Sequence, residues 1–487
     1  MPAIFLGIEI ILYMCYNILY IFRDWRKYEE KKVYTMNIII VGGGTVGSAI
    51  CTQLAREDHD ITVVDENAEA LAILADSCDV FGVAGNGAEV EVLRKAHAEK
   101  ADLLIAVSAK DETNLLCCAV ARKLGTKHTV ARVRNPEYSE LTQLLQSDMN
   151  LSFTINPELA VANEIYRLLR FPSAAKINTF CRGKVELAEI VIDESSPFCG
   201  VTLNDLRRKL NIKFLVCGVL RAGVAHIPSG HFSIEAGDTV CVTAPEKEIT
   251  NLFKAMGVYK TPIKNVLIAG GGRTTYYLLS LLKNAKIDAS VIDKDEDVCH
   301  DLAAKYSCTV ICDDSSRQEA LLEAGIKKAD AFLALSGIDE ENAIISMYAK
   351  AIDLDKVITM ISRMSYMDFF KKAGLESIVS PRSATVSDIV RYVRSMASGG
   401  ASSGIESLHK ILGDGVEALE FSIKNTIEGV TDIPLKQLKP RAGVLIACIV
   451  RGNEVIIPSG DDVISKSDTV IVVTTGNRTE SIKDIIA

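Results

Sequence analysis

The feature that most constrains this chain is an internal duplication. When the 487-residue sequence is aligned with itself, NIIIVGGG at residues 37–44 falls on NVLIAGGG at 265–272, and the match runs without a gap through residue 114. A later motif also recurs, because IPSG at 227–230 returns at 457–460. Self-similarity at a nearly fixed offset indicates a repeated structural unit. The sequence therefore predicts one two-part unit that occurs twice.

The first part of each unit alternates short apolar runs with amphipathic stretches. In the first copy we expect strands near residues 37–41, 61–64, 79–83, 103–107 and 129–133, with helices between them. Alternation of this kind is typical of a doubly wound parallel sheet of the Rossmann type. The second part has short strands and PSG turns, which favour a small α+β domain. The predicted segments are a hydrophobic extension at 1–35, Rossmann domains at 36–152 and 263–382, and small domains at 175–258 and 404–487.

A glycine-rich turn follows the first predicted strand, within MNIIIVGGGTVGSAI at residues 36–50. Gly42, Gly44 and Gly47 match G-x-G-x-x-G, in which the glycines allow a tight turn, close approach of a pyrophosphate and packing of the helix on the strand. The free amides at the start of a helix near Thr45 favour an anion. The context of strand, turn and helix favours a nucleotide site over a glycine turn without a ligand.

Asp65 ends the next predicted strand, ITVVD. A carboxylate at this place accepts hydrogen bonds from ribose hydroxyls and repels a 2′-phosphate. The expected ligand is therefore NAD or an adenine nucleotide such as ATP, and not NADP.

The second copy of the turn reads GGGRTT, with Thr275 in place of the third glycine and Asp293 in place of Asp65. A Cβ at position 275 is expected to push the helix off the strand, whereas Arg273 has the reach to meet a phosphate. Asp313 and Asp314 replace a Gly-Asn pair, which is unfavourable beside phosphate unless a cation intervenes. The second copy is either a weaker site for another ligand or a degenerate structural copy.

Composition and charge exclude several classes of function. The net charge of −9 argues against nucleic acid as the main partner. The 13 cysteines form no CxxC pair and no metal-ligand pattern, which indicates reduced thiols in a cytosolic protein and no metal site. No nucleophile elbow, P-loop or zinc-protease motif is present, and the small domains offer no acid–base set beside a nicotinamide. The chain reads as a non-catalytic binding protein.

The first 35 residues differ from the rest of the chain. Residues 4–22 are nearly all apolar and a run of basic residues follows them, which suits a membrane anchor with the remainder in the cytoplasm. Glu9 and Asn17 weaken that interpretation. The alternative is an extension that precedes a true start at Met36.

These motifs resemble the TrkA family, the peripheral nucleotide-binding subunits of bacterial Trk potassium uptake systems. The resemblance is carried by the glycine turn, by LRKAHAEKADLLIAVSAKDETN at 93–114, by ARVRNPEY at 131–138 and by the duplication itself. It implies two tandem regulator-of-potassium-conductance (RCK) units, a homo-oligomeric ring (dimer or tetramer), a membrane potassium-translocating partner similar to TrkH or TrkG, and a peripheral place on the inner face of the membrane. The apolar extension departs from the family pattern.

The resemblance also implies a set of nucleotide contacts. In the first half these are Gly42, Gly43, Gly44, Thr45 and Val46 at the phosphate turn, Asp65 at the ribose, Asn86 beside the adenine, Ser108 and Ala109 at a strand end, and Arg132 near the phosphates. In the second half they are Gly270, Gly271, Gly272, Arg273, Thr274 and Asp293.

The sequence thus predicts a regulator that responds to NAD(H) or to ATP and ADP. Two other hypotheses stay open at this point: an RCK-type regulator of another cation channel or antiporter, and an NAD-dependent oxidoreductase.

Overall fold

The computed structural model describes residues 35–138, 151–257, 261, 263–397, 405–413, 415–475, 479 and 481–486. All but the last residue of the predicted hydrophobic extension at 1–35 lies outside this part of the chain. Within the described residues, no helix has the length and apolar character needed to cross a membrane.

The first Rossmann domain is a six-stranded sheet in the order β3-β2-β1-β4-β5-β6, and its strands are parallel, as the alternating pattern predicts. Only β6 was not predicted, because three residues are too few to show a pattern. The strands are β1 (Asn37–Val41), β2 (Asp60–Asp65), β3 (Phe81–Ala84), β4 (Leu103–Ala106), β5 (His128–Arg132) and β6 (Phe153–Ile155). The helices are α2 (Thr45–Ala55), α3 (Ala68–Ser77), α4 (Val90–Lys95) and α5 (Asp111–Leu124).

The central strand β1 is buried on both faces, which explains its unbroken apolar run. Ile38 and Ile40 belong to one hydrophobic cluster, with Leu54 of α2, while Ile39 and Val41 belong to another, with residues of α4 and α5. This alternation holds the end of β1, and so the glycine turn, between two layers of helices.

The second Rossmann domain repeats this order as β14-β13-β12-β15-β16-β17. Its strands are β12 (Asn265–Ala269), β13 (Asp288–Asp293), β14 (Thr309–Cys312), β15 (Ala331–Ala334), β16 (Lys356–Met360) and β17 (Ser377–Val379). Its helices are α10 (Arg273–Ala285), α11 (Glu296–Lys305), α12 (Gln318–Glu323), α13 (Asp339–Ala351) and α14 (Met367–Lys372).

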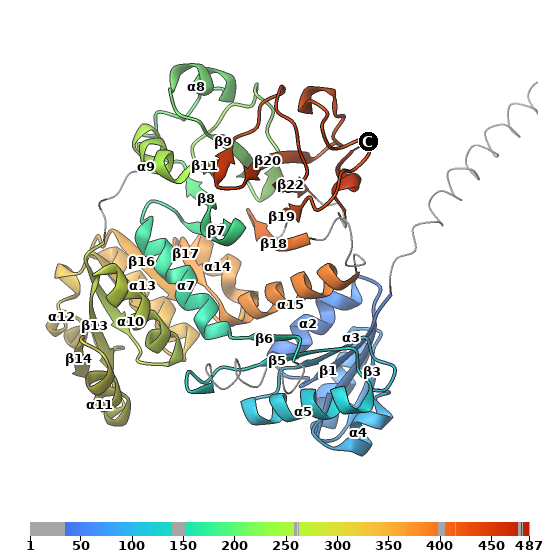
Figure 1. Cartoon of the computed structure of the whole chain (residues 1–487). Helices are drawn as coiled ribbons and strands as arrows, with labels where there is room; N and C mark the ends of the chain where they lie inside the picture. Colours follow the sequence, from blue (N-terminus) through green and yellow to red (C-terminus); the bar gives the residue numbers. More distant parts are fainter. Residues whose placement is uncertain are drawn as a thin grey trace, which may run out of the picture.

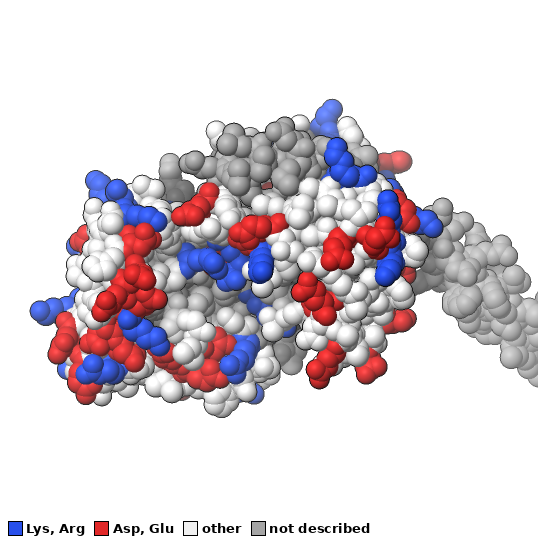
Figure 2. Space-filling view, turned by 90° about the horizontal axis from the view of Figure 1, so that it is seen from below, with Lys and Arg blue, Asp and Glu red and all other residues white. Residues whose placement is uncertain are grey.

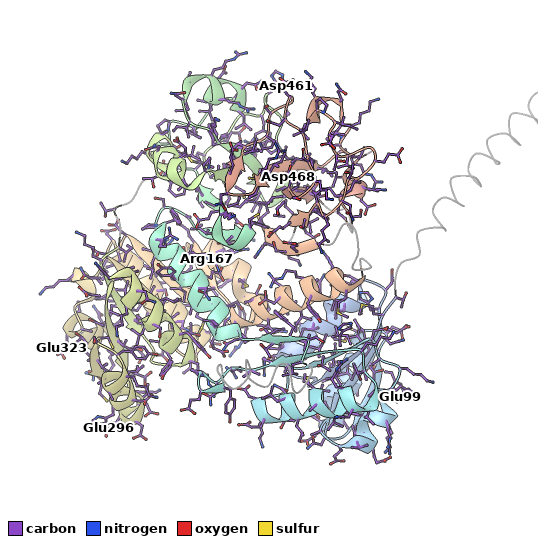
Figure 3. All side chains as sticks on the ribbon, viewed as in Figure 1. Glu99, Arg167, Glu296, Glu323, Asp461 and Asp468 are labelled. Atoms are coloured by element: carbon purple, nitrogen blue, oxygen red, sulfur yellow. The ribbon has the colours of Figure 1, made fainter. Side chains whose placement is uncertain are left out.

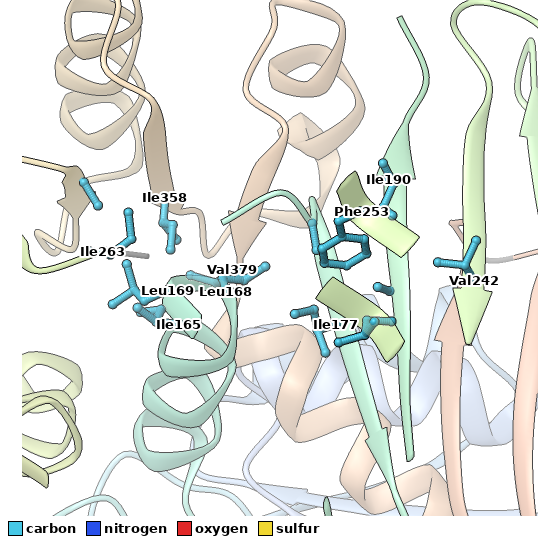
Figure 4. Close-up of a cluster of buried hydrophobic side chains, with 14 of the residues drawn as sticks. Ile165, Leu168, Leu169, Ile177, Ile190, Val242, Phe253, Ile263, Ile358 and Val379 are labelled. Atoms are coloured by element: carbon cyan, nitrogen blue, oxygen red, sulfur yellow. The ribbon is translucent and has the colours of Figure 1, made fainter. Parts of the chain in front are cut away.

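Each Rossmann domain is followed by a long helix that packs on the other half of the molecule. Helix α7 (Pro157–Arg170) follows the first domain, yet its Ile165 and Leu168 share a cluster with Leu278 of α10 and Ile358 of β16 (Figure 4). Helix α15 (Pro381–Ala397) follows the second domain, and its Ile389 and Val393 pack in the cluster that contains α2. The exchange of these two helices joins the halves into one body.

The small domains are two five-stranded antiparallel sheets, in the orders β10-β9-β11-β8-β7 and β18-β19-β22-β20-β21. A shared cluster that includes Leu187, Cys217, Leu412 and Val473 packs one sheet against the other. The first contains β7 (Lys176–Phe180), β8 (Val185–Val191), α8 (Leu203–Lys209), β9 (Leu215–Arg221), β10 (Val224–His226), β11 (Thr239–Ala244) and α9 (Glu246–Ala255). The second contains β18 (Ile405–Ile411), β19 (Val416–Ser422), β20 (Val444–Arg451), β21 (Glu454–Ile456) and β22 (Thr469–Thr475).

Figure 1 shows the paired small domains at the top and the two Rossmann domains side by side below, with α7 and α15 between these layers. A cavity of about 1590 Å³ lies at the boundary and is lined by charged residues of both layers, such as Glu164, Lys176 and His409. Arg167 also lines it, and Figure 3 shows this residue on α7 below the small domains.

Candidate nucleotide-binding sites

The first glycine turn has a backbone that larger residues would not permit. Gly42 has φ +105°, and a Cβ on it would lie 2.9 Å from the amide nitrogen of Ser108. At Gly47 a Cβ would lie only 1.8 Å from the carbonyl oxygen of Gly42. Gly44 has open space around it and precedes Thr45, the first residue of α2, without a side-chain cap. The amides at the start of α2 are thus free to bind an anion.

Asp65 lies at the carboxyl end of β2, beside this turn. Its carboxylate accepts one hydrogen bond from the Gly43 amide at 2.6 Å and another from the Asn67 amide at 2.8 Å. A carboxylate has about four acceptor positions, so two positions are left for ribose hydroxyls. The same contacts hold the side chain in place before a ligand arrives.

The loop after β3 forms the next wall. Asn86 accepts a hydrogen bond from the Ala88 amide at 2.9 Å through its side-chain oxygen, which orders the loop. A Cβ on Gly87 would lie 2.3 Å from Val41 Cγ1, so the loop packs closely against the end of β1. Asn86 is only partly exposed, and its amide group keeps its donors for a base.

The ends of β4 and β5 close the site. The Ser108 amide donates to Asn114 Oδ1 at 2.8 Å, and Asn114 Nδ2 donates to the carbonyl oxygen of Arg132 at 2.9 Å. Ala109, next to Ser108, is exposed. Asn114 was not among the predicted site residues. Its recurrence as Asn342 was the available signal, and its role is to fix the two strand ends.

Arg132 is the strongest indication of an anionic ligand. Its side chain is buried, with 8% exposure, and one terminal nitrogen donates to the Ser108 carbonyl oxygen at 2.8 Å. Its Nε is buried and has no hydrogen-bond partner among the described residues. Burial lowers the pKa of this guanidinium, and the nearby Arg134 lowers it further. The carboxylates of Glu158 and Asp111 act in the opposite direction, so what a phosphate would add is an acceptor for the unpaired Nε.

The second half reproduces the turn almost unchanged. Gly270 has φ +104°, and the Gly271 amide donates to Asp293 at 2.6 Å. Gly272 again precedes the helix, which begins with the exposed Arg273 and the buried Thr274. The hydroxyl of Thr275 donates to the Gly270 carbonyl oxygen at 2.6 Å. In the second half this hydrogen bond takes the place of the close approach between Gly47 and the Gly42 backbone. The presence of threonine at position 275 did not by itself predict the bond.

Other positions of the second half differ chemically. Met360 is the last residue of β16, as Arg132 is the last residue of β5. The two positions are equivalent, because the Asn342 side chain donates to the Met360 carbonyl oxygen and the Asn114 side chain donates to the Arg132 carbonyl oxygen. The predicted pair of acidic residues follows β14, and there Arg317 lies 3.2 Å from the Asp313 carboxylate. A cation does intervene, but Met360 leaves this strand end without the buried arginine that the first half has there.

A doubly wound sheet with a glycine turn and a carboxylate after the second strand defines a Rossmann-type nucleotide-binding domain. Here it occurs twice, each time with a small antiparallel domain. The TrkA-N domain family matches residues 38–152 and 266–381, and the TrkA-C domain family matches 187–257 and 429–487. The chain therefore belongs to the TrkA family, which confirms the resemblance.

Relatives and solved structures agree with this assignment. The chain is 32% identical over 442 residues to the Trk system potassium uptake protein TrkA of Vibrio alginolyticus, covering 90% of this chain and 95% of that protein. It is 30% identical over 455 residues to a TrkA homolog of Archaeoglobus fulgidus, covering 92% of this chain and all of the relative. The fold resembles the RCK domain of GsuK, with a TM-score of 0.60, 17% identity, and coverage of 91% of this chain and 92% of the other. A GsuK channel structure bound to NAD also has a TM-score of 0.60 and 17% identity, over 91% of this chain and 77% of that one.

Proposed function

We propose that this chain is the non-catalytic, nucleotide-binding regulatory subunit of a Trk-type potassium uptake system. The observation that carries the proposal is the first site, where a free helix start, the preorganised Asp65 and the buried Arg132 guanidinium with its unpaired Nε lie around one turn. The family membership supports the choice of transport system. The regulated partner is a separate membrane translocation subunit similar to TrkH or TrkG.

The ligands are NAD(H) or ATP and ADP, held by the residues that the sequence singled out. The first half supplies Gly42 through Gly47, Asp65, Asn86, Ser108, Ala109 and Arg132. The second half supplies Gly270 through Thr274 and Asp293, and binds more weakly. Support comes from the free amides, the carboxylate and the buried guanidinium, which match a phosphate-linked ribose.

Exchange of one nucleotide for another shifts the protein between two shapes. A ligand does this only through a difference in affinity for the two shapes, and a coupling of about 1–3 kcal/mol is the ordinary scale. The protein acts as a homo-oligomeric ring on the cytoplasmic side of the membrane. In each chain we assign the nucleotide domains to residues 36–152 and 263–382 and the small domains to 175–258 and 404–487.

The decisive experiment is a calorimetric titration of the full chain with ATP, ADP, NAD and NADH, counting bound ligands per chain. We expect one tight site, and a second that is weak or absent. No affinity for any of the four would refute the proposal. Turnover of NADH with a reducible substrate would favour an oxidoreductase instead.

A further inference from the structure

Helix α15 of the second half packs against α2, the helix that follows the first glycine turn. At its carboxyl end, Arg394 donates to the carboxylate of Glu57, which follows α2, at 2.6 Å. One or two turns earlier, its Val390 packs in the cluster that contains Ile50 of α2. Val386 and Val46 are partly buried against the same cluster. The two helices therefore pack side by side with their carboxyl ends together, which directs the start of α15 toward the start of α2.

Arg382 is the second residue of α15 and lies in that first turn. Its Nε is buried without a hydrogen-bond partner, and its guanidinium forms no ion pair with any residue in the described part of the chain. Burial lowers the pKa of this group. Burying a charged guanidinium without a counter-charge costs free energy. A bound anion would offset this cost.

The matching helix α7 shows where such a residue lies. Glu158 is the second residue of α7, as Arg382 is of α15, and both helices begin with proline directly after a three-residue strand and one capping residue. Asn156 at the start of α7 donates to the Tyr277 hydroxyl on α10 at 2.7 Å. The Tyr277 hydroxyl in turn donates to the Arg134 carbonyl oxygen at 3.3 Å. Because α10 begins at Arg273, directly after the second glycine turn, the start of α7 lies near that turn. By the same packing, Arg382 lies near the first.

Glu158 differs from Arg382 in that its charge is already compensated. It accepts a hydrogen bond from Arg134 Nε at 2.6 Å. At this position α7 therefore has a carboxylate that is paired with Arg134, whereas α15 has a guanidinium without an ion-pair partner among the described residues. The two halves therefore differ at two positions, since Arg382 corresponds to Glu158 and Arg132 corresponds to Met360.

We propose that Arg382 completes the first nucleotide site from the opposite half, so that Arg132 and Arg382 together hold the phosphate chain of an adenine nucleotide. This inference rests on the proposed function and specifies which residues distinguish ligands by phosphate number. Figure 2, seen from below, shows a few basic side chains near the middle of this face, with acidic side chains around them. Because the two arginines belong to different halves, a longer phosphate chain ties the halves together more strongly than AMP does.

The test is calorimetric titration of the full chain with ATP, ADP and AMP, at one fixed salt concentration. For Arg382→Gln we expect affinity for ATP to fall about tenfold or more, affinity for ADP to fall less and affinity for AMP to stay within twofold. Arg382→Lys, which keeps the charge without the bidentate geometry, should give an intermediate loss of ATP affinity. Arg391→Gln is the matched control, because Arg391 lies on the same helix, pairs with Asp388 at 2.8 Å and lines the cavity beneath the small domains.

Each outcome decides the matter. Selective loss of ATP affinity in Arg382→Gln, absent in Arg391→Gln, supports the inference. Equal losses for ATP and AMP, or no loss, overturn it while leaving the proposed function intact. If the Arg382→Gln chain unfolds at a lower temperature than wild type, the ratio of ATP to AMP affinity in the folded Arg382→Lys chain decides instead. Failure of the wild-type chain to bind any of the three nucleotides would instead count against the proposed function itself.

Discussion

The two halves of this molecule have the same backbone at their glycine turns and different chemistry around them. Gly42 and Gly270 have φ angles of +105° and +104°, and in both halves a carboxylate accepts from the second glycine amide at 2.6 Å. The first turn then faces Arg132, a buried guanidinium, where the second faces Met360. The same turn conformation therefore does not give the two halves the same affinity for a ligand, because affinity for a polyanion depends on the charges that surround the turn.

The halves also differ in how their exchanged helices end. Arg394 of α15 bonds the carboxylate of Glu57 at 2.6 Å and that of Glu417 at 3.0 Å, and Glu57 is only 5% exposed. The corresponding Arg170 of α7 is exposed and lies over the Phe171 ring at 5.2 Å. The first Rossmann domain is thus bound to the rest of the chain by a buried charge network at this position.

Replacing Arg394 should give the largest effect. Arg394→Ala leaves the buried Glu57 carboxylate without this cation, which we expect to lower the free energy of unfolding by about 3–5 kcal/mol. Arg170→Ala should lower it by about 1 kcal/mol or less, because that site is exposed. Urea denaturation of the two full-length variants measures both values. Similar losses would show that the two helix ends do not differ in strength.

The next effect tests the helix–strand approach. Gly47→Ala places a Cβ 1.8 Å from the Gly42 carbonyl oxygen, so the helix must move, and we expect a loss on the order of 3 kcal/mol. In the second half Thr275→Ala keeps the Cβ and removes only the hydroxyl that donates to Gly270. That should lower stability by about 1 kcal/mol. Thermal unfolding of the variants compares them, and a harmless Gly47→Ala would contradict the packing described.

The nucleotide sites themselves are compared through their carboxylates. Asp65→Ala removes the carboxylate that we propose binds the ribose, and it should reduce nucleotide affinity by on the order of 2 kcal/mol, at least roughly tenfold. Asp293→Ala should do less, because the second turn lacks the buried arginine. Asp65→Asn, which keeps one acceptor oxygen, should fall between wild type and alanine. Equal losses from Asp65→Ala and Asp293→Ala in calorimetric titrations would contradict the asymmetry.

Much of this architecture could be predicted from the sequence, and the limits have physical causes. Local sequence patterns identify the apolar strand before Gly42, the glycine turn and Asp65. Each of these patterns occurs in both halves of the chain. The exchange of α7 and α15 was not predicted, because an apolar helix face shows that a helix packs but not which sheet it covers. The environment of Arg132 and the position of Arg382 depend on contacts between distant segments, so they needed the structure.

The smallest effect concerns pH and compares equivalent strands of the small domains. His409 pairs with Ala418 across β18 and β19, as Asn178 pairs with Leu187 across β7 and β8. Both residues line the interdomain cavity. Burial there, together with Arg391, Lys176 and Arg167, lowers the pKa of His409 to about 3.

Because the ordinary pKa of histidine is about 6.5, the unfolded chain takes up a proton at position 409 at a pH where the folded chain does not. Stability therefore falls as pH falls below 6.5, and His409 accounts for about 1 kcal/mol between pH 6.5 and 5.5. Glu164 and Asp388 line the same cavity, and burial raises the pKa of both carboxyls, which acts in the opposite direction as pH falls. The difference between wild type and His409→Asn, which gives the second half the residue of the first, isolates the histidine. Urea denaturation at several pH values should show a shallower decline on acidification for the variant. Parallel curves would mean that His409 is already protonated in the folded protein near pH 6.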